Sequence, residues 1–438
     1  MAPSKVCGFR DPLNHLALRE ELVHYFHYKK NKLYCEDVSI AALARQVGTP
    51  FYLYSQATLE RHFTVFDRAF SGIPHLICYS VKASSNLAIL KLFRKMGAGF
   101  DIVSGGELMR ALKAGGAPRK IVFSGVGKSE DEIDLGLQRD ILQFNVESET
   151  ELQILEARAR ALKKVARISF RVNPDVDPKT HPYISTGLSQ HKFGIPIEAA
   201  PALYRKARRS PYLSITGIGY HIGSQITQVD PFVDALTRLK RMVVNLKSSG
   251  TTIRHLDLGG GLGITYNDEV PPHPDDYGKI VVDLVKDLDC TVLLEPGRVL
   301  VGNAGILVTR VLLTKRNRDK NFIVIDAAMN DLVRPSLYGS YHGIQPETLT
   351  RRARWIADVV GPICESGDFL ARARQMPVVK RGELLAIMSA GAYGFVLASN
   401  YNSRPRIPEV MVKGTTVKVI RKRESFKDLI RGESANAV

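Results

Sequence analysis

The stretch Ile77-Cys-Tyr-Ser-Val-Lys-Ala-Ser-Ser-Asn86 decides the interpretation of the fold. Its first residues have strand character, and the run ends in the amine of Lys82 before small polar residues follow. A strand of this kind delivers its last side chain to the mouth of the sheet or barrel that it builds. In an apolar wall the pKa of a lysine falls, and the neutral amine can form a Schiff base with an aldehyde. A lysine at a strand end is more often a solvated surface charge, so the rest of the chain has to decide between the two roles.

From residue 77 onward, short β-branched runs alternate with segments of helical periodicity. Glycine or polar residues follow each run. The predicted strands span residues 77–82, 100–104, 121–125, 142–146, 167–172, 215–221, 255–259 and 291–295. The predicted helices span residues 87–96, 106–114, 130–138, 149–163, 198–209, 231–247 and 275–287. This alternation predicts a (β/α)8 barrel, with a doubly wound open sheet as the alternative.

The residues with useful chemistry fall where these strands end. A barrel carries its active site at the C-terminal ends of its strands, so it would bring such residues together. They are Lys82, Asp101, Asn173, His221, Ser224, the glycines 259–261 and the segment 295–298. No open sheet would collect all of them so simply, which favours the barrel.

Residues 302–438 have a different pattern, with short strands separated by turns at 306–313, 321–327, 354–360, 383–389 and 417–421. A β-rich second domain is therefore expected, with residues 33–36 adding a strand from the N-terminus. The predicted division is a barrel at 48–301 and a β-rich domain made of 1–47 and 302–438.

The totals of the chain exclude several classes of protein. Its 438 residues are 45% hydrophobic and 24% charged, which is ordinary for a globular protein of two or three domains. Neither a membrane span nor the apolar core of a signal peptide is evident, so a cytoplasmic protein without membrane attachment is expected. Five cysteines without a CxxC pair suit a reducing compartment and argue against a zinc site. The net charge of +17 lies in short bursts without interleaved aromatic residues, which favours solvated faces over nucleic-acid binding.

Two motifs in the last third of the barrel match a phosphate-bearing cofactor. Leu258-Gly-Gly-Gly-Leu-Gly-Ile264 is not a dinucleotide fingerprint, because Ile264 stands where the last glycine belongs, yet its backbone can approach a phosphate closely. Glu295-Pro-Gly-Arg298 supplies a carboxylate and a guanidinium at the end of the last strand. A glutamate facing the pyridine nitrogen of pyridoxal phosphate would keep that nitrogen protonated, and the arginine would pair with phosphate or carboxylate. A flexible turn and a surface ion pair are the ordinary alternatives.

Further candidates are single residues, each of which could instead have only a structural role. His221 could stack on a flat ring and Ser224 could donate to a phosphate. In the β-rich part, the thiol of Cys364 could return a proton to a carbanion and Glu365 could hold an ammonium group, although a buried, inert cysteine is the default. Arginine and tyrosine side chains that could bind a carboxylate stand at Arg334, Tyr338 and Tyr393.

Taken together, these motifs resemble the diaminopimelate decarboxylases. The quoted residues are Tyr79-Ser-Val-Lys82, Phe100-Asp-Ile-Val-Ser-Gly-Gly-Glu-Leu108, Phe170-Arg-Val-Asn-Pro174, Thr180-His-Pro-Tyr-Ile-Ser-Thr-Gly187, Lys192-Phe-Gly194, His221-Ile-Gly-Ser-Gln225, Gly259-Gly-Gly-Leu-Gly263, Glu295-Pro-Gly-Arg298, Arg334-Pro335, Cys364-Glu365, Gly391-Ala-Tyr393 and Ser399-Asn-Tyr-Asn402. The similarity runs in order from about residue 30 to the C-terminal tail. That family has an alanine racemase-like fold and depends on pyridoxal phosphate.

The resemblance implies a role for each matching residue. Lys82 would hold the cofactor, Glu295 would pair with its ring nitrogen, and His221 would stack on its face. Its phosphate would be bound by Ser224, Gly260, Gly261, Gly297 and Tyr393, and Asp101 and Arg298 would also bind the cofactor. The substrate would be held by Arg298, Arg334, Tyr338, Glu365 and Tyr393. Cys364 would be the proton donor and would reach the site from the second subunit of a head-to-tail homodimer.

The implied reaction is decarboxylation of meso-2,6-diaminopimelate to L-lysine, the last step of lysine biosynthesis. An ornithine, lysine or arginine decarboxylase of the same fold is the nearest alternative, but those enzymes typically have Cys-Asp where this chain has Cys364-Glu365. A catalytically dead regulatory homologue is the alternative from another class. Two departures from the family pattern stand at Ser84, expected to cap a helix, and at Gly339-Ser-Tyr341.

Overall fold

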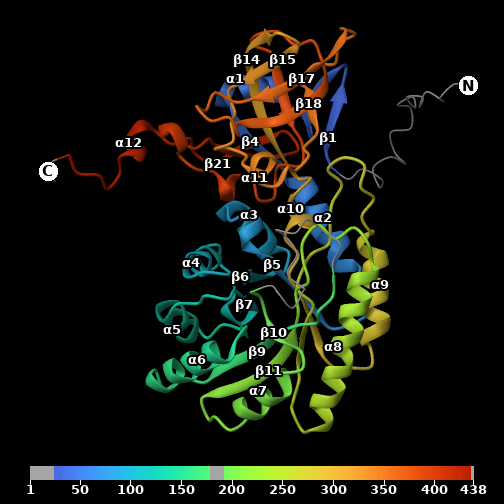
Figure 1. The fold of residues 1–438 in the computed structure, drawn as a ribbon, viewed down its shortest axis with the longest axis vertical. Coiled ribbons are helices and arrows are strands. Elements are labelled where there is room, and N and C mark those ends of the chain that lie inside the picture. Colours follow the sequence, from blue (N-terminus) through green and yellow to red (C-terminus); the bar gives the residue numbers. More distant parts are fainter. Residues whose placement is uncertain (1–23, 178–191, 436–438) are drawn as a thin grey trace, which may run out of the picture.

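The structure is a computed structural model, and it describes residues 24–177 and 192–435. Two lobes follow one another along the long axis (Figure 1). The lower lobe contains the strands and helices between α3 and α9, and the upper lobe contains the long strands from β14 onward. The motif at 180–187 and the residues before Val23 that bore on a signal peptide lie outside the described residues.

The lower lobe is a closed barrel of eight parallel strands. In chain order they are β5 (His75–Ser80), β6 (Gly99–Ile102), β7 (Ile121–Phe123), β8 (Gln143–Val146), β9 (Ala166–Asn173), β11 (Leu213–Gly219), β12 (His255–Asp257) and β13 (Thr291–Leu294). Each strand pairs with its neighbour, β8 also pairs with β9, and β13 pairs in parallel with β5, so the ring is complete. The predicted barrel is confirmed and the open sheet is excluded. A short strand β10 (Ile195–Pro196) lies beside β9 outside the ring.

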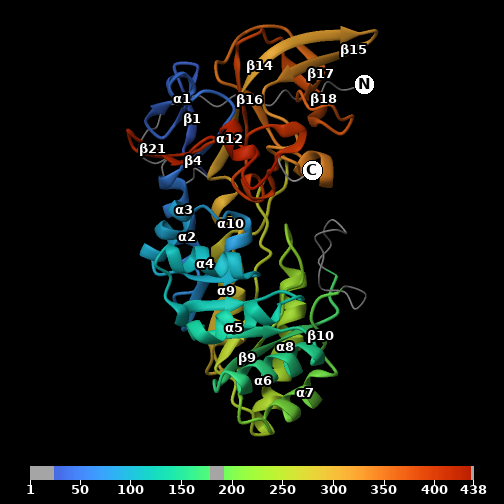
Figure 2. The same cartoon turned by 90° about the vertical axis from the view of Figure 1, so that its left-hand side faces the viewer.

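Helices cover the outside of the barrel (Figure 2). They are α3 (Leu87–Lys95), α4 (Gly105–Lys113), α5 (Glu130–Arg139), α6 (Glu149–Ala161), α7 (Ala200–Ala207), α8 (Asp230–Ser248) and α9 (Pro274–Val285), whereas the short α10 (Arg298–Val301) lies at the junction of the lobes. Several begin at a side chain that accepts a backbone N–H: Asn86, Ser104, Ser129 and Ser148. Such a cap satisfies an amide that would otherwise lack a partner in the first turn. The cap of α3 is Asn86, so the expected capping role of Ser84 is wrong.

The upper lobe is built on a sheet of nine strands with several turns between them. They are β4 (Phe51–Ser55), β14 (Gly305–Asn317), β15 (Lys320–Ile325), β16 (Ile344–Pro346), β17 (Arg354–Val360), β18 (Phe369–Pro377), β19 (Leu384–Ile387), β20 (Glu409–Lys413) and β21 (Thr416–Arg421). Helices α11 (Arg334–Tyr338) and α12 (Phe426–Leu429) belong to the same part of the chain. The predicted β-rich domain is therefore present. Strand β18 was missed because its exposed arginines interrupt the apolar alternation.

The N-terminal residues complete the upper lobe, although not by the predicted route. Strands β1 (Phe26–Lys29), β2 (Lys32–Cys35) and β3 (Val38–Ser39) form a separate sheet, followed by α1 (Ile40–Val47). Their apolar side chains share one core with those of β4, β14 and β20.

The division between the lobes falls after β4 and not at residue 48. Strand β4 pairs with β14 and with β20, so it lies inside the upper sheet. Helix α2 (Gln56–Arg68), which packs against α9 and α10, begins the barrel lobe. Burial on both faces explains the error, because all five residues of β4 are buried and the strand looks like any buried barrel strand.

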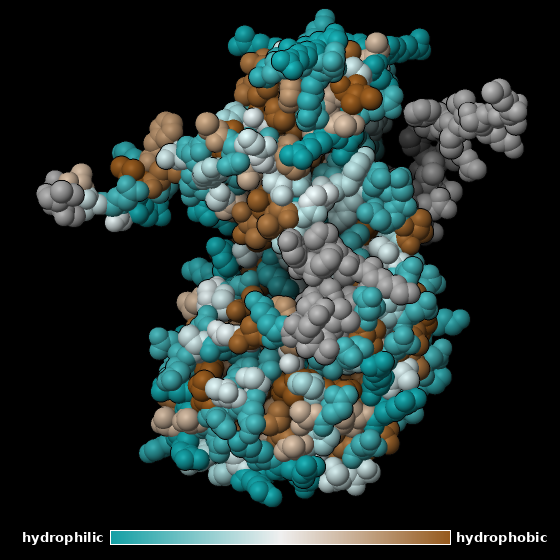
Figure 3. All heavy atoms as spheres, in the orientation of Figure 1, coloured by the Kyte–Doolittle hydropathy of each residue, from teal (hydrophilic) through white to brown (hydrophobic). Residues whose placement is uncertain are grey.

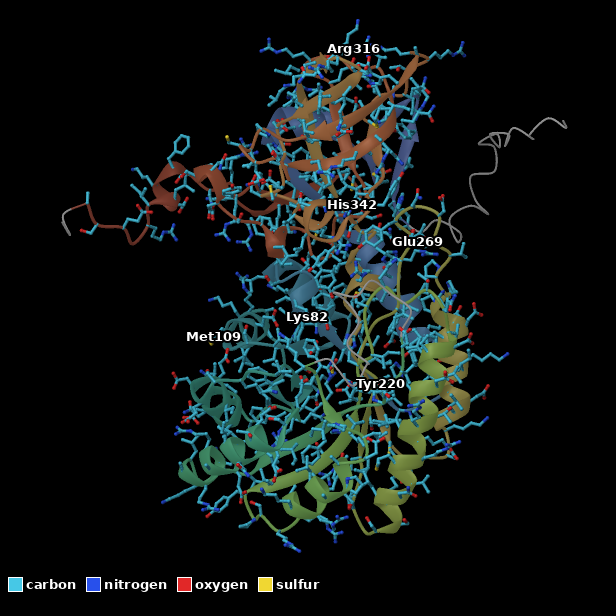
Figure 4. The ribbon with its side chains drawn as sticks, viewed as in Figure 1. Lys82, Met109, Tyr220, Glu269, Arg316 and His342 are labelled. Atoms are coloured by element: carbon cyan, nitrogen blue, oxygen red, sulfur yellow. The ribbon has the colours of Figure 1, made fainter. Side chains whose placement is uncertain are left out.

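One of the basic bursts of the sequence lies far from the barrel mouth. The basic segment 315–320 lies at the hairpin end of β14 and β15, and Arg316 marks the end of the molecule far from Lys82 (Figure 4). Figure 3 shows hydrophilic residues over much of one face and a narrow waist between the lobes, hollowed on one side. No helix in the described part of the chain is long and apolar enough to cross a membrane.

Candidate active site

Lys82 lies at the junction of the lobes, as Figure 4 shows. Strand β5 ends at Ser80 and a 3-10 turn (Val81–Ala83) carries the lysine to the open mouth of the barrel. About a third of its side chain (36%) is exposed. The Nζ atom lies 3.1 Å from Oδ2 of the buried Asp101, and the same oxygen accepts a hydrogen bond from Ser80 Oγ at 2.6 Å.

The surroundings of Lys82 contradict one prediction from the sequence. Burial disfavours its ammonium form, but the carboxylate of Asp101 outweighs burial, with help from Tyr393 and Glu295, and raises the pKa of Lys82. The expected fall of the pKa in an apolar wall is therefore wrong, because the wall is acidic. The amine is held as an ammonium group until an incoming group changes the charge balance.

Two adjoining cavities meet at Lys82, His221 and Glu295. One runs along the glycine loop 259–261 to Arg298 and Tyr393. The other, of about 320 Å³, lies over Ser124, Asn145 and Asp257. The structure thus brings together Lys82, Asp101, His221, Ser224, Gly260, Gly261, Glu295, Gly297, Arg298 and Tyr393, which are the predicted cofactor residues.

Glu295 is buried at the meeting point of the cavities. Its Oε1 accepts hydrogen bonds from Ser124 Oγ and Asn145 Nδ2, both at 3.2 Å. Burial raises the pKa of Glu295 well above its usual value, and the neighbouring carboxylates Asp101 and Asp257 raise it further. The pKa of Asp257 is itself raised to about 6, mainly by burial. A cationic ring nitrogen beside Glu295 would relieve this repulsion.

His221 and the glycine loop form one wall. His221 Nδ1 accepts the N–H of Gly260 at 3.1 Å, so its proton sits on Nε2. Burial, together with the charges of Arg171 and Lys82, lowers the pKa of His221 far below its usual value, and the ring is neutral. A side chain on Gly260 would lie 2.2 Å from the carbonyl oxygen of Glu295. Because the loop packs so closely against the end of β13, position 260 has no room for a side chain and requires glycine.

Arg298 begins α10 and is 5% exposed. It donates to Tyr266 OH at 2.6 Å and to Ser224 Oγ at 2.9 Å. Its guanidinium lies 4.9 Å from the centre of the Tyr393 ring. Tyr393 comes from the upper lobe, has a positive φ of 55°, and donates its N–H to Ala83 O at 2.8 Å. A positive φ costs energy in a residue with a side chain, so the packing against the Lys82 turn must hold this conformation in place.

Arg334, like Arg298, has its guanidinium close to the ring of Tyr266. It is 5% exposed, and its guanidinium lies 5.2 Å from the ring centre of Tyr266 and 5.8 Å from that of Tyr338. Its Nε faces His342 Nε2 at 3.4 Å, and Nη2 donates to Ser340 Oγ at 3.2 Å. The pKa of His342 is lowered to about 3, mainly by burial and further by the charge of Arg334, so that its imidazole is neutral.

The two guanidiniums share a property that is rare for buried charges. Every hydrogen bond described for Arg298 and Arg334 goes to a neutral group. Within residues 24–177 and 192–435, no carboxylate lies within the 4.0 Å of an ion pair from either one. Buried charges are normally paired, so this pair of side chains indicates a site for anionic groups from outside the chain.

Cys364 and Glu365 are not at this site. Both are exposed on the upper lobe and neither lines the cavities around Lys82. The backbone N–H of Cys364 donates to Asn402 Oδ1 at 2.9 Å, and Tyr401 OH donates to Glu365 Oε2 at 3.3 Å. Their predicted roles depend on a second subunit and stay predictions.

A family model for the pyridoxal binding domain of pyridoxal-dependent decarboxylases matches residues 56–302. The diaminopimelate decarboxylase of Vibrio cholerae is 52% identical over 412 residues, which cover 94% of this chain and 99% of that protein. The chain belongs to the diaminopimelate decarboxylase family. The enzyme of that name from Haemophilus influenzae is 50% identical over 414 residues, 94% of this chain and 100% of its own.

Solved structures agree with this membership. The diaminopimelate decarboxylase of Helicobacter pylori, crystallised with L-lysine, has a TM-score of 0.87 and 42% identity, and the match covers 89% of this chain and 98% of that one. The chain is accordingly a decarboxylase that uses pyridoxal phosphate. Its residues fit that cofactor, because an amine, a buried carboxylate and an arginine without an acidic partner all face the same cavities.

Several residues of the site were not found from the sequence. They are Ser80, Ser124, Asn145, Arg171, Asp257, Tyr266, Ser340 and His342. Asp257 and Asn145 could have been found, because both lie within predicted barrel strands as Asp101 does. Tyr266 and His342 carry no such signal, since both lie in loops.

Proposed function

We propose that the protein removes CO₂ from the D-configured centre of meso-2,6-diaminopimelate and releases L-lysine, as the last step of lysine biosynthesis. The observation that carries the proposal is the pair of buried guanidiniums without an acidic partner, Arg298 and Arg334. One side chain would suffice for the phosphate of the cofactor. A second one, turned toward Tyr338, fits a substrate whose far end is also a carboxylate.

The roles of the chain's own residues follow from their positions. Lys82 is the amine that carries the cofactor, and Asp101 sets its charge. Glu295 would pair with the ring nitrogen of the cofactor, His221 would supply a neutral flat wall, and Ser224 with the glycine loop would hold the phosphate. Pyridoxal phosphate, when bound, accepts the electron pair that remains on the substrate carbon after CO₂ leaves. The carbon then needs one proton.

Cys364 is proposed as the source of that proton, delivered by a second copy of the chain. Its exposure on the upper lobe, beside Glu365, supports a shared site in a homodimer. The C–C bond to CO₂ breaks, a C–H bond forms, and the thiol is restored by a proton from water. All four cysteines of the described residues are free thiols, which also supports a cytoplasmic protein.

The substrate assay compares carbon dioxide and lysine production from meso-diaminopimelate with turnover of L-ornithine, L-lysine and L-arginine. We expect equal amounts of CO₂ and lysine from diaminopimelate and slow or no reaction with the others. The variant Arg334→Met should lower kcat/KM for diaminopimelate by roughly 10- to 100-fold, the range expected for a lost charge-assisted hydrogen bond. Arg316→Met, on the distant hairpin, is the matched control. Preference for a substrate without the second carboxylate would refute the proposal, as would substrate binding without any CO₂ release.

The dimer is tested by mixing two inactive variants, Lys82→Ala and Cys364→Ala. If each site takes its lysine from one chain and its thiol from the other, mixed dimers regain one intact site. Random exchange should then restore about a quarter of the wild-type activity. No recovery after verified subunit exchange would contradict the shared site.

A further inference from the structure

A polar network lies inside the barrel beneath Lys82, where barrels of this type usually hold apolar side chains. At its centre is Asn145, at the end of β8 and 5% exposed. Its Nδ2 lies 2.9 Å from Asp257 Oδ2, 3.1 Å from Ser124 Oγ and 3.2 Å from Glu295 Oε1. One amide group therefore donates to two carboxylates that come from different strands.

A hydrogen bond from Gln143 fixes the orientation of the Asn145 side-chain amide. Asn145 Oδ1 accepts a hydrogen bond from Gln143 Nε2 at 2.9 Å. Gln143 is completely buried, and its Oε1 lies 2.8 Å from His255 Nδ1 and 3.1 Å from Thr216 Oγ1, whose single proton also has Ile168 O at 2.9 Å as an acceptor. With its proton on Nδ1, His255 donates to Gln143 Oε1, which leaves the NH₂ group of Gln143 to point at Asn145. Asn145 in turn has to present its own NH₂ group to the carboxylates.

The charges around Glu295 make such a donor necessary. Asp101 on β6 and Asp257 on β12 repel its ionised form, whereas Lys82 and Arg171 on β9 favour it. His221 after β11 is neutral and does not contribute a charge. Burial of three carboxylates in one place favours proton uptake, and hydrogen bonds to the ionised form oppose it. Among the described residues, Ser124 and Asn145 donate such bonds to Glu295, and the carboxyl group of Asp257 is also hydrogen-bonded to it.

We propose that Asn145 is a positioning residue that turns the Glu295 carboxylate to the cavity and favours its ionised form, with Gln143 setting the direction of its amide. The inference rests on the proposed pairing of Glu295 with the cofactor's ring nitrogen. It does not depend on which amino acid is the substrate.

The test uses the holoenzyme and its visible absorbance, which reports the cofactor without substrate. Asn145→Asp keeps the shape, removes both N–H donors and adds a negative charge. We expect the pH at which the cofactor absorbance changes on the acid side to rise by about one unit, since one unit corresponds to one hydrogen bond of this strength. The affinity for pyridoxal phosphate should fall about tenfold for the same reason. Gln143→Met should change the transition pH and the cofactor affinity in the same directions, but by less. Asn245→Asp, on the exposed face of α8, should change neither the transition pH nor the affinity.

A role in stability alone would show a different result. If Asn145→Asp lowers the thermal midpoint but leaves the absorbance profile and cofactor affinity unchanged, the inference is wrong. Should Asn145→Asp not fold, an unchanged profile in Gln143→Met overturns the inference in its place. A wild-type protein that binds the cofactor and titrates as expected, yet does not decarboxylate diaminopimelate, would contradict the proposed function and still support this inference.

Discussion

Tyr266 offers the sharpest test of how the anion site is built. Its hydroxyl accepts from Arg298 Nη1 at 2.6 Å, and the centre of its ring lies 5.7 Å from the guanidinium of Arg298 and 5.2 Å from that of Arg334. The substitution Tyr266→Phe removes the hydroxyl and keeps the ring. The substitution therefore tests the hydrogen bond to Arg298 separately from the contacts that the ring makes with the guanidiniums of Arg298 and Arg334.

The expected size follows from the burial of the arginine. A hydrogen bond to a charged group contributes about 1.5–3 kcal/mol, which corresponds to roughly 10- to 100-fold in binding. Arg298 keeps its bond to Ser224 and can recover part of the loss, so the lower end applies. We expect KM for diaminopimelate to rise about tenfold with kcat changed less than about twofold, because the lost contact holds the ground state and the transition state alike.

Steady-state kinetics at saturating cofactor measure this change. Tyr212→Phe is the matched control, since that ring lies against Arg160 away from the cavities. Tyr266→Leu, which also removes the ring, should raise KM further, because it ends the contact with Arg334. An unchanged KM in Tyr266→Phe, or a fall of kcat without a change of KM, would refute the assignment of Tyr266 to the anion site.

Three further predictions use the charged groups around the site. Lys82→Ala should show neither bound-cofactor absorbance nor turnover, and full turnover by this variant would contradict the central role of the lysine. Asp101→Asn removes the nearest negative charge and should lower the pKa of Lys82. The pH that the apo-protein needs to take up the cofactor, followed by absorbance, should then fall by about one unit or more. An unchanged pH profile would mean that other groups set the charge of Lys82. For His342, burial lowers the folded-state pKa to about 3 while the unfolded chain takes up its proton near 6.5. The contribution of neutral His342 to stability is fully present above about pH 6.5 and is lost as the pH falls toward 3. His342→Gln should therefore reduce the fall of the thermal midpoint between about pH 6.5 and 4. An equally steep fall in the variant would show that other groups cause it.

Much of the fold could be predicted from the sequence because its signals are local. Each barrel strand is a short β-branched run with an amphipathic helix behind it, and parallel strands need such crossovers. The position of Lys82, Asp101 and Glu295 at strand ends then follows from the architecture, since all strands of the barrel end on the same side. Strand β4 was assigned to the wrong lobe because its sequence reports burial but not which sheet buries it.

The sequence by itself determined the barrel, the amine at its mouth and the acid and glycines that meet it there. Only the tertiary structure decided the charge of that amine, whose pKa rises where apolar surroundings had been expected, because the opposing carboxylate of Asp101 comes from the neighbouring strand. It also decided the anion site, where Arg298, Tyr266 and Arg334 meet from three separate segments. Periodicity describes how a side chain is placed on its own strand or helix, whereas electrostatic interactions depend on distances between groups that the folding of the whole chain brings together.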